Sequence, residues 1–167
     1  MSDVLVVIDM QNDFLTGVFG SEYAASVIKP ISGYAREFNG DVFFTKDTHY
    51  EDTFSNSLEG QAFPLHCAKG TEGHEICREL ADLANENNTI EKAGFGSVDL
   101  VEVVKDYDNV YLVGVCTDIC VISNALLLRA HYPNKKIHVV DRLCRGLNET
   151  NHKAAITVLY SCLIEVI

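Results

Sequence analysis

The sequence has few basic residues and no long apolar run, and both shortages exclude a class of protein. Its 167 residues include 13 lysines and arginines against 24 acidic residues, a formal net charge of -11. Such a surface repels phosphate backbones, so we exclude nucleic acid as a main partner. It also steers neutral or cationic small molecules better than anions. No apolar run approaches the roughly 18 residues that a membrane-spanning helix requires, so we expect no membrane partner.

Linker segments and a secretion signal are missing as well. No stretch rich in Pro, Gly or Ser divides the chain, so we expect a single domain over residues 1–167. The first residues do not combine a basic region with a following apolar stretch, so we expect a cytoplasmic protein. In that compartment the six cysteines are expected to be reduced thiols rather than disulfides.

The sequence does contain β-branched apolar runs that alternate with segments of helical pattern. The runs are continuous, which is typical of parallel strands covered by helices on both faces. We therefore predict a three-layer α/β/α fold with a mainly parallel, six-stranded sheet. The predicted strands are 4–8, 41–45, 89–91, 110–113, 136–140 and 161–166, and the predicted helices are about 21–38, 75–86, 97–105, 118–130 and 149–159.

Local signals add detail to two parts of this outline. Ser97 and Asp118 directly precede or open predicted helices, and both residue types favour the N-cap position. The segment 47–73 has no clear periodicity, so it is predicted to be a long irregular loop. Loops of that length in a compact domain are usually functional or disordered.

Three chemically reactive side chains follow predicted strands. Asp9 follows the first strand, Lys92 follows the third, and Cys120 lies near the start of the helix after the fourth. Because parallel strands end at one edge of the sheet, an acid/base, a cation and a thiol are expected to meet there. The helix start is expected to lower the pKa of the Cys120 thiol and to offer N–H groups to an oxyanion. This trio is the outline of a cysteine hydrolase.

Each of these residues also has an ordinary structural role. Cys120 could be a small buried residue opening an apolar helix, and Asp9 could be a turn or cap carboxylate. Lys92 could be a solvated side chain, and the neighbouring Asp13 is expected to serve as a turn carboxylate. The catalytic interpretation therefore depends on the three residues occurring together.

A candidate metal site follows the second strand. Asp47 and His49 are two residues apart in extended chain, so both side chains can reach one ion, and His66 and Glu59 would arrive from the long loop. Two imidazoles with one or two carboxylates suit zinc, iron or manganese. The alternative is that these are polar loop residues bonded to the backbone. Two further carboxylates compete for the site: Glu51 and Asp52.

The motifs taken in order resemble those of the isochorismatase-like cysteine hydrolases. The likeness runs along the whole chain, and it is strongest to the nicotinamidase/pyrazinamidase group. An opening Asp-x-Gln-x-Asp-Phe combined with a later Thr-Asp-x-Cys is a specific pair. The matching segments are Asp9 to Phe14, Thr45 to His49, Phe63 to Thr71, Lys92, and Gly114 to Cys120.

The resemblance implies a Rossmann-like, isochorismatase-like hydrolase fold and assigns roles to single residues. It implies that Cys120 is the nucleophile, Asp9 the proton-transfer acid/base and Lys92 the cation between them. It implies a cis peptide before Cys116, with the backbone N–H groups of Cys116 and Cys120 forming the oxyanion hole. The aromatic positions lining the ring pocket correspond to Phe14 and Phe63, and the chain has no Trp, which many relatives place against the ring. The implied metal ligands are Asp47, His49, Glu59 and His66.

The implied activity is hydrolysis of nicotinamide to nicotinate and ammonia through a thioester, as part of NAD salvage. The implied cofactor is a divalent metal, with zinc favoured over iron or manganese. The implied substrate is a small neutral amide. Because many relatives form homo-oligomers, further copies of the chain are implied as partners. Two alternatives stay open. One is a hydrolase of the same superfamily that acts on another carboxamide or an N-carbamoyl compound. The other is a non-catalytic ligand-binding α/β domain.

Overall fold

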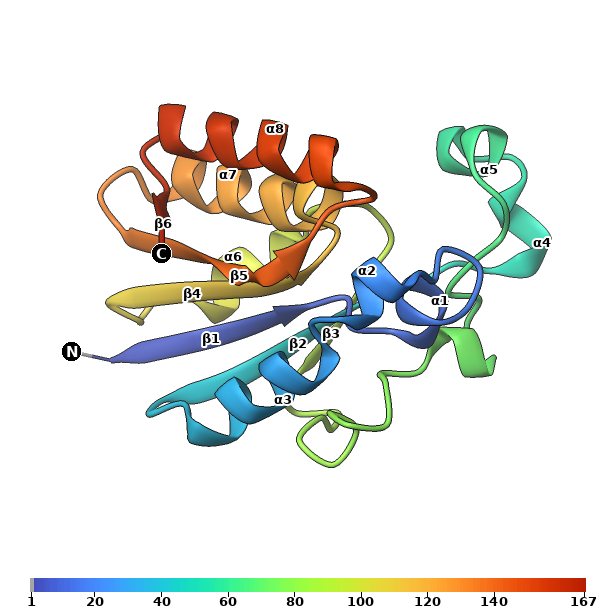
Figure 1. Cartoon of the computed structure of the whole chain (residues 1–167), viewed down its shortest axis with the longest axis horizontal. Coiled ribbons are helices and arrows are strands. Elements are labelled where there is room, and N and C mark those ends of the chain that lie inside the picture. Colours follow the sequence, from blue (N-terminus) through green and yellow to red (C-terminus); the bar gives the residue numbers. More distant parts are fainter. Residues whose placement is uncertain (1) are drawn as a thin grey trace.

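The β-branched runs form the strands of one parallel sheet in the computed structural model, which describes residues 2–167 (Figure 1). All neighbouring strands pair in parallel, in the order β3-β2-β1-β4-β5-β6. The predicted sheet is therefore confirmed. The strands are β1 Asp3–Ile8, β2 Asp41–Asp47, β3 Thr89–Lys92, β4 Asn109–Val115, β5 Lys136–Arg145 and β6 Glu165–Val166.

This strand order places a switch point in the middle of the sheet. From β1 the chain builds outward through β2 and β3, and it then returns to the other side of β1 to add β4, β5 and β6. The connections that leave β1 and β4 therefore run in opposite directions, which opens a crevice at the carboxyl ends of these two strands. Asp9 directly follows β1, and Cys116 directly follows β4.

Helices cover both faces of the sheet, which completes the predicted three layers. One face packs against the first three helices and carries a core that includes Phe14, Ile31 and Phe44. The other face packs against the later helices, with Leu100, Leu128 and Leu159 in its core. On the first face lie α1 Asn12–Leu15, α2 Glu22–Ala25 and α3 Ile28–Glu37, and on the second lie α6 Val98–Val103, α7 Ile122–His131 and α8 Glu149–Ser161.

The segment predicted to be irregular contains two short helices, α4 Glu51–Phe54 and α5 Leu58–Ala62. They project beyond the carboxyl edge of the sheet (Figure 1). A 3₁₀ turn, η1 Glu72–His74, ends this connection. Within the described residues, no helix is long and apolar enough to cross a bilayer.

The helix predicted over 75–86 is wrong. The start of this segment pairs its backbone with the chain after β1: Cys77 N–H donates to the Met10 carbonyl, and Glu75 O accepts from Asn12 N–H. Beyond Cys77 the backbone forms separate turns, with Leu80 N–H donating to the Cys77 carbonyl and Leu83 N–H to the Leu80 carbonyl. Ile76, Cys77 and Leu80 are nevertheless buried, which explains the apolar spacing. The hydrophobic pattern identified core residues but not the backbone that carries them.

Two other predicted elements have different bounds. The helix predicted over 21–38 is interrupted between α2 and α3, because Pro30 has no N–H to donate to the carbonyl four residues earlier. In the first turn of α3 that missing donor costs nothing, since the first N–H groups of a helix have no partner within it. The strand predicted over 161–166 is reduced to β6, because α8 continues to Ser161.

One of the two predicted N-caps is confirmed. The Ser97 hydroxyl accepts the Leu100 N–H at the start of α6. Asp118 is not a cap, because the helical segment begins earlier with a π-type turn, η2 Thr117–Val121, that leads into α7. The Asp118 carboxylate reaches across to the β5–α8 connection, where it accepts the Leu147 N–H at 2.9 Å.

Candidate functional site

Asp9, Lys92 and Cys120 meet at the carboxyl edge of the sheet, as their strand-end positions predicted. The Lys92 ammonium lies 2.7 Å from Oδ2 of Asp9 and 3.6 Å from Sγ of Cys120. All three side chains are buried, with exposed fractions of 0%, 5% and 4%. One cation therefore contacts an acid/base and a thiol in a site shielded from water.

Thr45 fixes the orientation of Asp9. The backbone of Asp9 has a φ of 48°, which turns the chain sharply at the end of β1. The Thr45 hydroxyl donates to Oδ1 of Asp9 at 2.6 Å, and its oxygen accepts the Asp9 N–H at 3.2 Å. Oδ1 of Asp9 is thus hydrogen-bonded to Thr45, and Oδ2 faces Lys92. Sequence reasoning missed Thr45, because a threonine inside a strand gives no local signal of such a contact.

Burial is the largest single influence on the pKa of each member of this trio, but its effect prevails only at Asp9 and Cys120. It raises the pKa of Asp9, against the opposing effect of Lys92. Burial lowers the pKa of Lys92, but Asp9, Cys120 and Asp47 outweigh it, so the net pKa is raised and the ammonium stays charged. Burial and the Asp9 charge raise the pKa of Cys120 well above its usual value. The predicted lowering of the Cys120 pKa is therefore wrong, because full burial and the neighbouring carboxylate oppose a thiolate more strongly than Lys92 supports it.

The chain between β4 and η2 has an unusual backbone. Gly114 has a φ of 121°, and a Cβ there would lie 2.1 Å from the Ile8 carbonyl oxygen, so only glycine fits. The Val115–Cys116 peptide is cis, as the resemblance implies. The turn that follows carries Cys120, which brings the predicted oxyanion-hole residues Cys116 and Cys120 to the same cavity.

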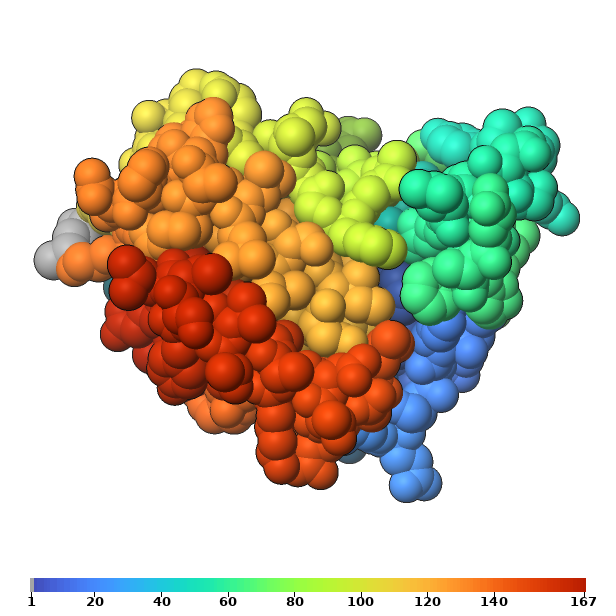
Figure 2. All heavy atoms as spheres, turned by 90° about the horizontal axis from the view of Figure 1, so that it is seen from above, coloured from blue at the N-terminus to red at the C-terminus, as the bar shows by residue number. Residues whose placement is uncertain are grey.

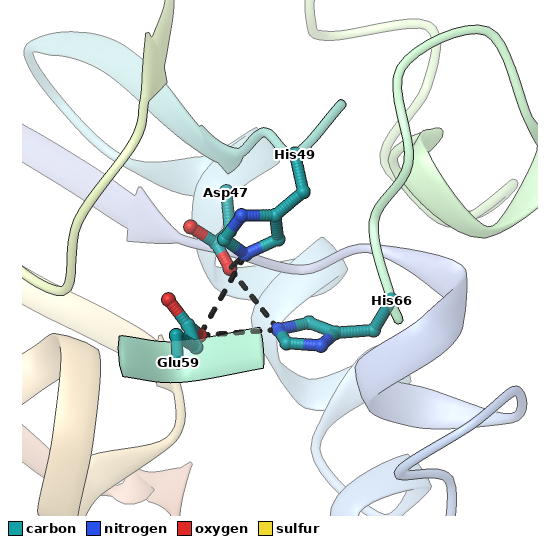
Figure 3. Close-up of side chains that lie close together, drawn as sticks. All are labelled: Asp47, His49, Glu59 and His66. Atoms are coloured by element: carbon teal, nitrogen blue, oxygen red, sulfur yellow. Dashed lines mark hydrogen bonds and ion pairs between the residues drawn. The ribbon is translucent and has the colours of Figure 1, made fainter. Parts of the chain in front are cut away.

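The four predicted metal ligands cluster beside this trio (Figure 3). Their ligand atoms all lie within 4.8 Å of one another. Nε2 of His49 lies 2.9 Å from Oδ2 of Asp47, and Nε2 of His66 lies 3.3 Å from Oε1 of Glu59. Asp47 ends β2, His49 follows it, and Glu59 and His66 arrive from α5 and the segment after it. The cluster completes only when α5 folds over the strand ends.

The donor set of this cluster fits a divalent cation. Nδ1 of His66 donates to the Pro64 carbonyl at 2.8 Å, which leaves Nε2 free to face the carboxylates. Burial lowers the pKa of His49 and His66, but the Asp47 and Glu59 carboxylates outweigh it and raise both to about 9. Without a metal ion, protons on the two imidazoles balance the charge of the two carboxylates. Two imidazoles with two carboxylates are also a typical ligand set for zinc, iron or manganese.

The two competing carboxylates lie outside the cluster. Glu51 and Asp52 are exposed in the first turn of α4. Glu59 is partly buried and faces both imidazoles, and its pKa is lowered to about 2 because hydrogen bonds from His49 and His66 outweigh the effect of burial. Of the three candidates, only Glu59 is within reach of the other ligands.

Two residues of the opening motif hold the backbone next to the four predicted metal ligands, which we call the metal cluster. Gln11 donates to the Asp47 carbonyl and accepts the Asp47 N–H, both at 2.8 Å, so its amide holds the Asp47 peptide on both sides. Oδ2 of Asp13 accepts the Cys67 N–H at 2.7 Å, next to His66. Oδ1 of Asp13 also accepts the Val18 N–H at 3.4 Å, which is the turn role that was predicted. The contacts of Asp13 with Cys67 and of Gln11 with Asp47 were missed, because each joins residues that are distant in sequence.

A narrow cavity is lined both by Cys120 and by three of the predicted metal ligands, Asp47, Glu59 and His66. Phe14 and Phe63, the predicted aromatic residues, both line it, and the buried Phe14, Cys116 and Cys120 form its inner end. Phe95 and Leu147 are exposed and form part of its rim. Sequence reasoning did not single out four further apolar side chains that line this cavity: Phe19, Phe95, Ile119 and Leu147.

The surface beside this cavity is hollowed. In Figure 2 the α4–α5 segment stands beside the yellow-green loop after β3, with a hollow between them. Leu58, Ala62 and Phe63 line it from one side, and Gly94 and Phe95 line it from the other. Because Phe63, Phe95 and Glu59 border both this hollow and the cavity, the approach to the site runs between α5 and this loop.

Comparison with known proteins gives a consistent match along the chain. The family profile described as "Isochorismatase domain" matches residues 3–167. The curated protein "Uncharacterized isochorismatase family protein PncA" of Bacillus subtilis (strain 168) is 30% identical over 174 residues, which cover 94% of this chain and 93% of that protein.

Solved structures share the fold over nearly the full length. The pyrazinamidase/nicotinamidase of Streptococcus mutans UA159 has 28% sequence identity and a TM-score of 0.84, with 99% of this chain and 100% of that chain covered. The N-carbamoylsarcosine amidase of Thermoplasma acidophilum has 26% identity and a TM-score of 0.75, with 99% and 95% covered.

Proposed function

The chain belongs to the isochorismatase family, and we propose that it is a metal-assisted cysteine amidohydrolase that converts nicotinamide to nicotinate and ammonia. The main support is the contact of one buried ammonium, Lys92, with both Asp9 and Cys120. A thiol at the cavity, with a proton acceptor and a fixed cation close behind it, is what nucleophilic attack on an amide requires. The similarity to a pyrazinamidase/nicotinamidase supports the choice of substrate.

In the first half of the reaction, Asp9 takes the proton of the Cys120 thiol as the sulfur attacks the amide carbon. Lys92 stays charged and stabilises the anion, whether the negative charge is on Asp9 or on Cys120. The carbonyl oxygen becomes an oxyanion that accepts the N–H groups of Cys116 and Cys120. Asp9 then gives its proton to the departing nitrogen, the C–N bond breaks, and ammonia leaves a thioester on Cys120.

In the second half, Asp9 removes a proton from a water molecule as the water oxygen attacks the thioester carbon. The same two N–H groups receive the second oxyanion, and the C–S bond then breaks. The proton held by Asp9 returns to Cys120, and the product leaves as nicotinic acid, which loses the other proton of the attacking water to solvent and becomes nicotinate. The raised pKa of Asp9 suits this exchange, because in each half of the reaction Asp9 takes up a proton, first from Cys120 and then from water, and passes it on.

Asp47, His49, Glu59 and His66 would hold the divalent cation. When bound, that ion would act as a Lewis acid toward the ring nitrogen of the substrate and so help to orient the ring. The chain's own contribution is to exclude water with the aromatic walls and to hold the four ligand atoms together.

Hydrolysis of an N-carbamoyl compound is the second candidate, favoured by the similarity to an N-carbamoylsarcosine amidase. An N-carbamoyl amino acid carries a carboxylate that needs a cationic partner. The described residues that line the cavity include no lysine or arginine and do include Asp47 and Glu59. A neutral aromatic amide therefore suits the lining better than an anionic substrate does.

Ammonia release from nicotinamide, pyrazinamide and N-carbamoylsarcosine tests the proposal. We expect turnover of the two aromatic amides and at least about 100-fold less turnover in the Cys120→Ala variant. Cys77→Ala, which removes another buried thiol outside the cavity, should keep wild-type kcat. Wild-type turnover in Cys120→Ala would disprove the nucleophile, and preference for the N-carbamoyl compound would favour the second candidate. No release from any of the three would favour a binding domain.

A further inference from the structure

Three side chains that the proposed chemistry does not use form a hydrogen-bonded chain behind the nucleophile. Oγ1 of Thr117 lies 2.8 Å from Nδ1 of His152, and Nε2 of His152 lies 2.8 Å from Oδ1 of Asp141. Thr117 is completely buried, and His152 has an exposed fraction of 9%. None of the three lines the cavity. They lie on three different elements, η2, α8 and β5.

The chemistry of these groups gives the hydrogen bonds one direction when the imidazole is neutral. Nε2–H donates to the Asp141 carboxylate, because an unprotonated nitrogen would face that charge with its lone pair. Nδ1 is then free to accept the Thr117 hydroxyl proton. Asp141 therefore sets the imidazole so that it can hold Thr117, and the buried hydroxyl has a partner.

A second contact joins the same two regions. The Asp118 carboxylate accepts the Leu147 N–H at 2.9 Å and the side-chain amide of Asn151 at 3.0 Å. Between them, Gly146 leaves no room for a side chain, since a Cβ would lie 2.7 Å from Oδ1 of Asp118. Two successive residues of η2 are thus attached to the start of α8 and to the loop before it.

The turn that receives these contacts has π-type backbone hydrogen bonding. Within η2, the N–H groups of both Ile119 and Val121 reach the Cys116 carbonyl at 3.1 Å, so two donors share one acceptor. Such π-type turns occur mostly as short irregularities in helices, often at functional sites. The side-chain contacts of Thr117 and Asp118 add to these hydrogen bonds in fixing the position of the turn.

We propose that His152 and Asp141 are positioning residues that hold Thr117 and thereby fix the Cys116 and Cys120 N–H groups toward the substrate oxygen. Thr117 lies directly after Cys116 and three residues before Cys120, so its side chain fixes the backbone between the two donors. This inference rests on the proposed function. It concerns the oxyanion hole alone, not the ionisation of the thiol, which depends on Asp9 and Lys92.

Two activities of Cys120 separate positioning from general loosening of the fold. Amide hydrolysis needs the oxyanion hole, whereas alkylation by iodoacetamide is a displacement at carbon that forms no oxyanion. We expect Thr117→Val and His152→Phe each to lower kcat for nicotinamide by about tenfold or more. KM and the alkylation rate of Cys120 should stay within about twofold of wild type, and the double variant should lose no more than the stronger single variant.

His138→Phe is the matched control. His138 is also a buried histidine on the sheet, 3.0 Å from Oε2 of Glu165, but it lies near the start of β5, at the opposite edge from the site. The His138→Phe variant should have the kcat of the wild type. Unchanged kcat in Thr117→Val and His152→Phe would overturn the inference. The inference would also be overturned if kcat and the alkylation rate of Cys120 fell by the same factor in Thr117→Val and His152→Phe, and if His138→Phe showed the same losses.

Hydrogen exchange decides the question even if the proposed function fails. Peptides covering 116–121 should exchange at least about threefold faster in Thr117→Val than in wild type and in His138→Phe, because the side chain that holds the turn is lost. Equal exchange would overturn the inference. A wild-type protein that releases no ammonia would disprove the function, and faster exchange at 116–121 would still support the positioning of η2 by His152.

Discussion

Lys92 places one positive charge among the carboxylates and the thiol of the site. Its ammonium is buried and contacts Asp9 at 2.7 Å, Asp47 at 3.4 Å and Cys120 at 3.6 Å. A buried cation without partners would cost several kcal/mol, so these contacts are needed for folding as well as for chemistry. The same ammonium faces both the acid/base and the metal cluster, which links the two halves of the site through one side chain.

Replacing Asp9 by Asn should lower kcat by at least about 100-fold, because an amide cannot accept the thiol proton. Lys92 keeps Asp47 as a partner in this variant, so the protein should still fold. Ammonia release and a thermal unfolding curve measure the two effects. Asp3→Asn is the control, since Asp3 begins the same strand and contacts Asn109 far from the site. Retained activity in Asp9→Asn would exclude Asp9 as the base.

At the scale of elements, the junction between β1 and β4 positions two of the proposed catalytic residues, Asp9 and Cys120. The two strands lie side by side, with Ile8 paired to Gly114, and each leads directly into a site residue. The close approach of Gly114 to Ile8 leaves no space for a Cβ. Asp9 and the turn that carries Cys120 are therefore brought together by backbone packing, before any side chain contributes.

Gly114→Ala should destabilise the fold by at least about 2 kcal/mol, because alanine is strained at this φ and its Cβ clashes with the Ile8 carbonyl. Urea unfolding measures the free energy. Gly33→Ala on α3 is the opposite case, since nothing lies within 4 Å of a Cβ there. That variant should gain roughly 0.5 to 1 kcal/mol from better helix propensity. Equal stability of the two variants would contradict the tight packing of Gly114.

At the scale of the whole molecule, the metal cluster joins the sheet to the α4–α5 segment. Asp47 and His49 come from the end of β2, whereas Glu59 and His66 come from α5 and the chain after it. Phe54 of α4 packs against the rings of His49 and His66, with centroids 4.6 and 5.5 Å apart. A bound ion would therefore hold the projecting segment against the strand ends and form part of the cavity wall.

Removal of the metal should lower stability and weaken substrate binding more than it lowers kcat. Zinc at about 100 times its Kd should add about 2.7 kcal/mol to the free energy of unfolding. The protein is treated with a chelator, zinc is restored, and Tm and KM are followed. His66→Ala should lose this response to zinc, and Glu51→Gln should keep it. A metal-free protein with unchanged KM would exclude the proposed role in orienting the ring.

The sequence by itself determined the order of the strands along the chain and the residues that follow them. Continuous β-branched runs mark buried parallel strands, and parallel strands share one carboxyl edge, so Asp9, Lys92 and Cys120 were predictable as a group. The metal residues followed from their types and spacing together with the family motifs. These properties are local or follow from general rules of topology.

Only the tertiary structure decided what depends on contacts between distant segments. The choice of Glu59 over Glu51 and Asp52 required the position of α5. The segment 75–86 forms no helix, because its start pairs with the chain after β1 and the residues beyond Cys77 fold into separate turns. The Cys120 thiol has a raised pKa because burial and a carboxylate from another strand outweigh the helix start. Backbone pairing and desolvation depend on every neighbour in space, and a linear pattern does not contain those neighbours.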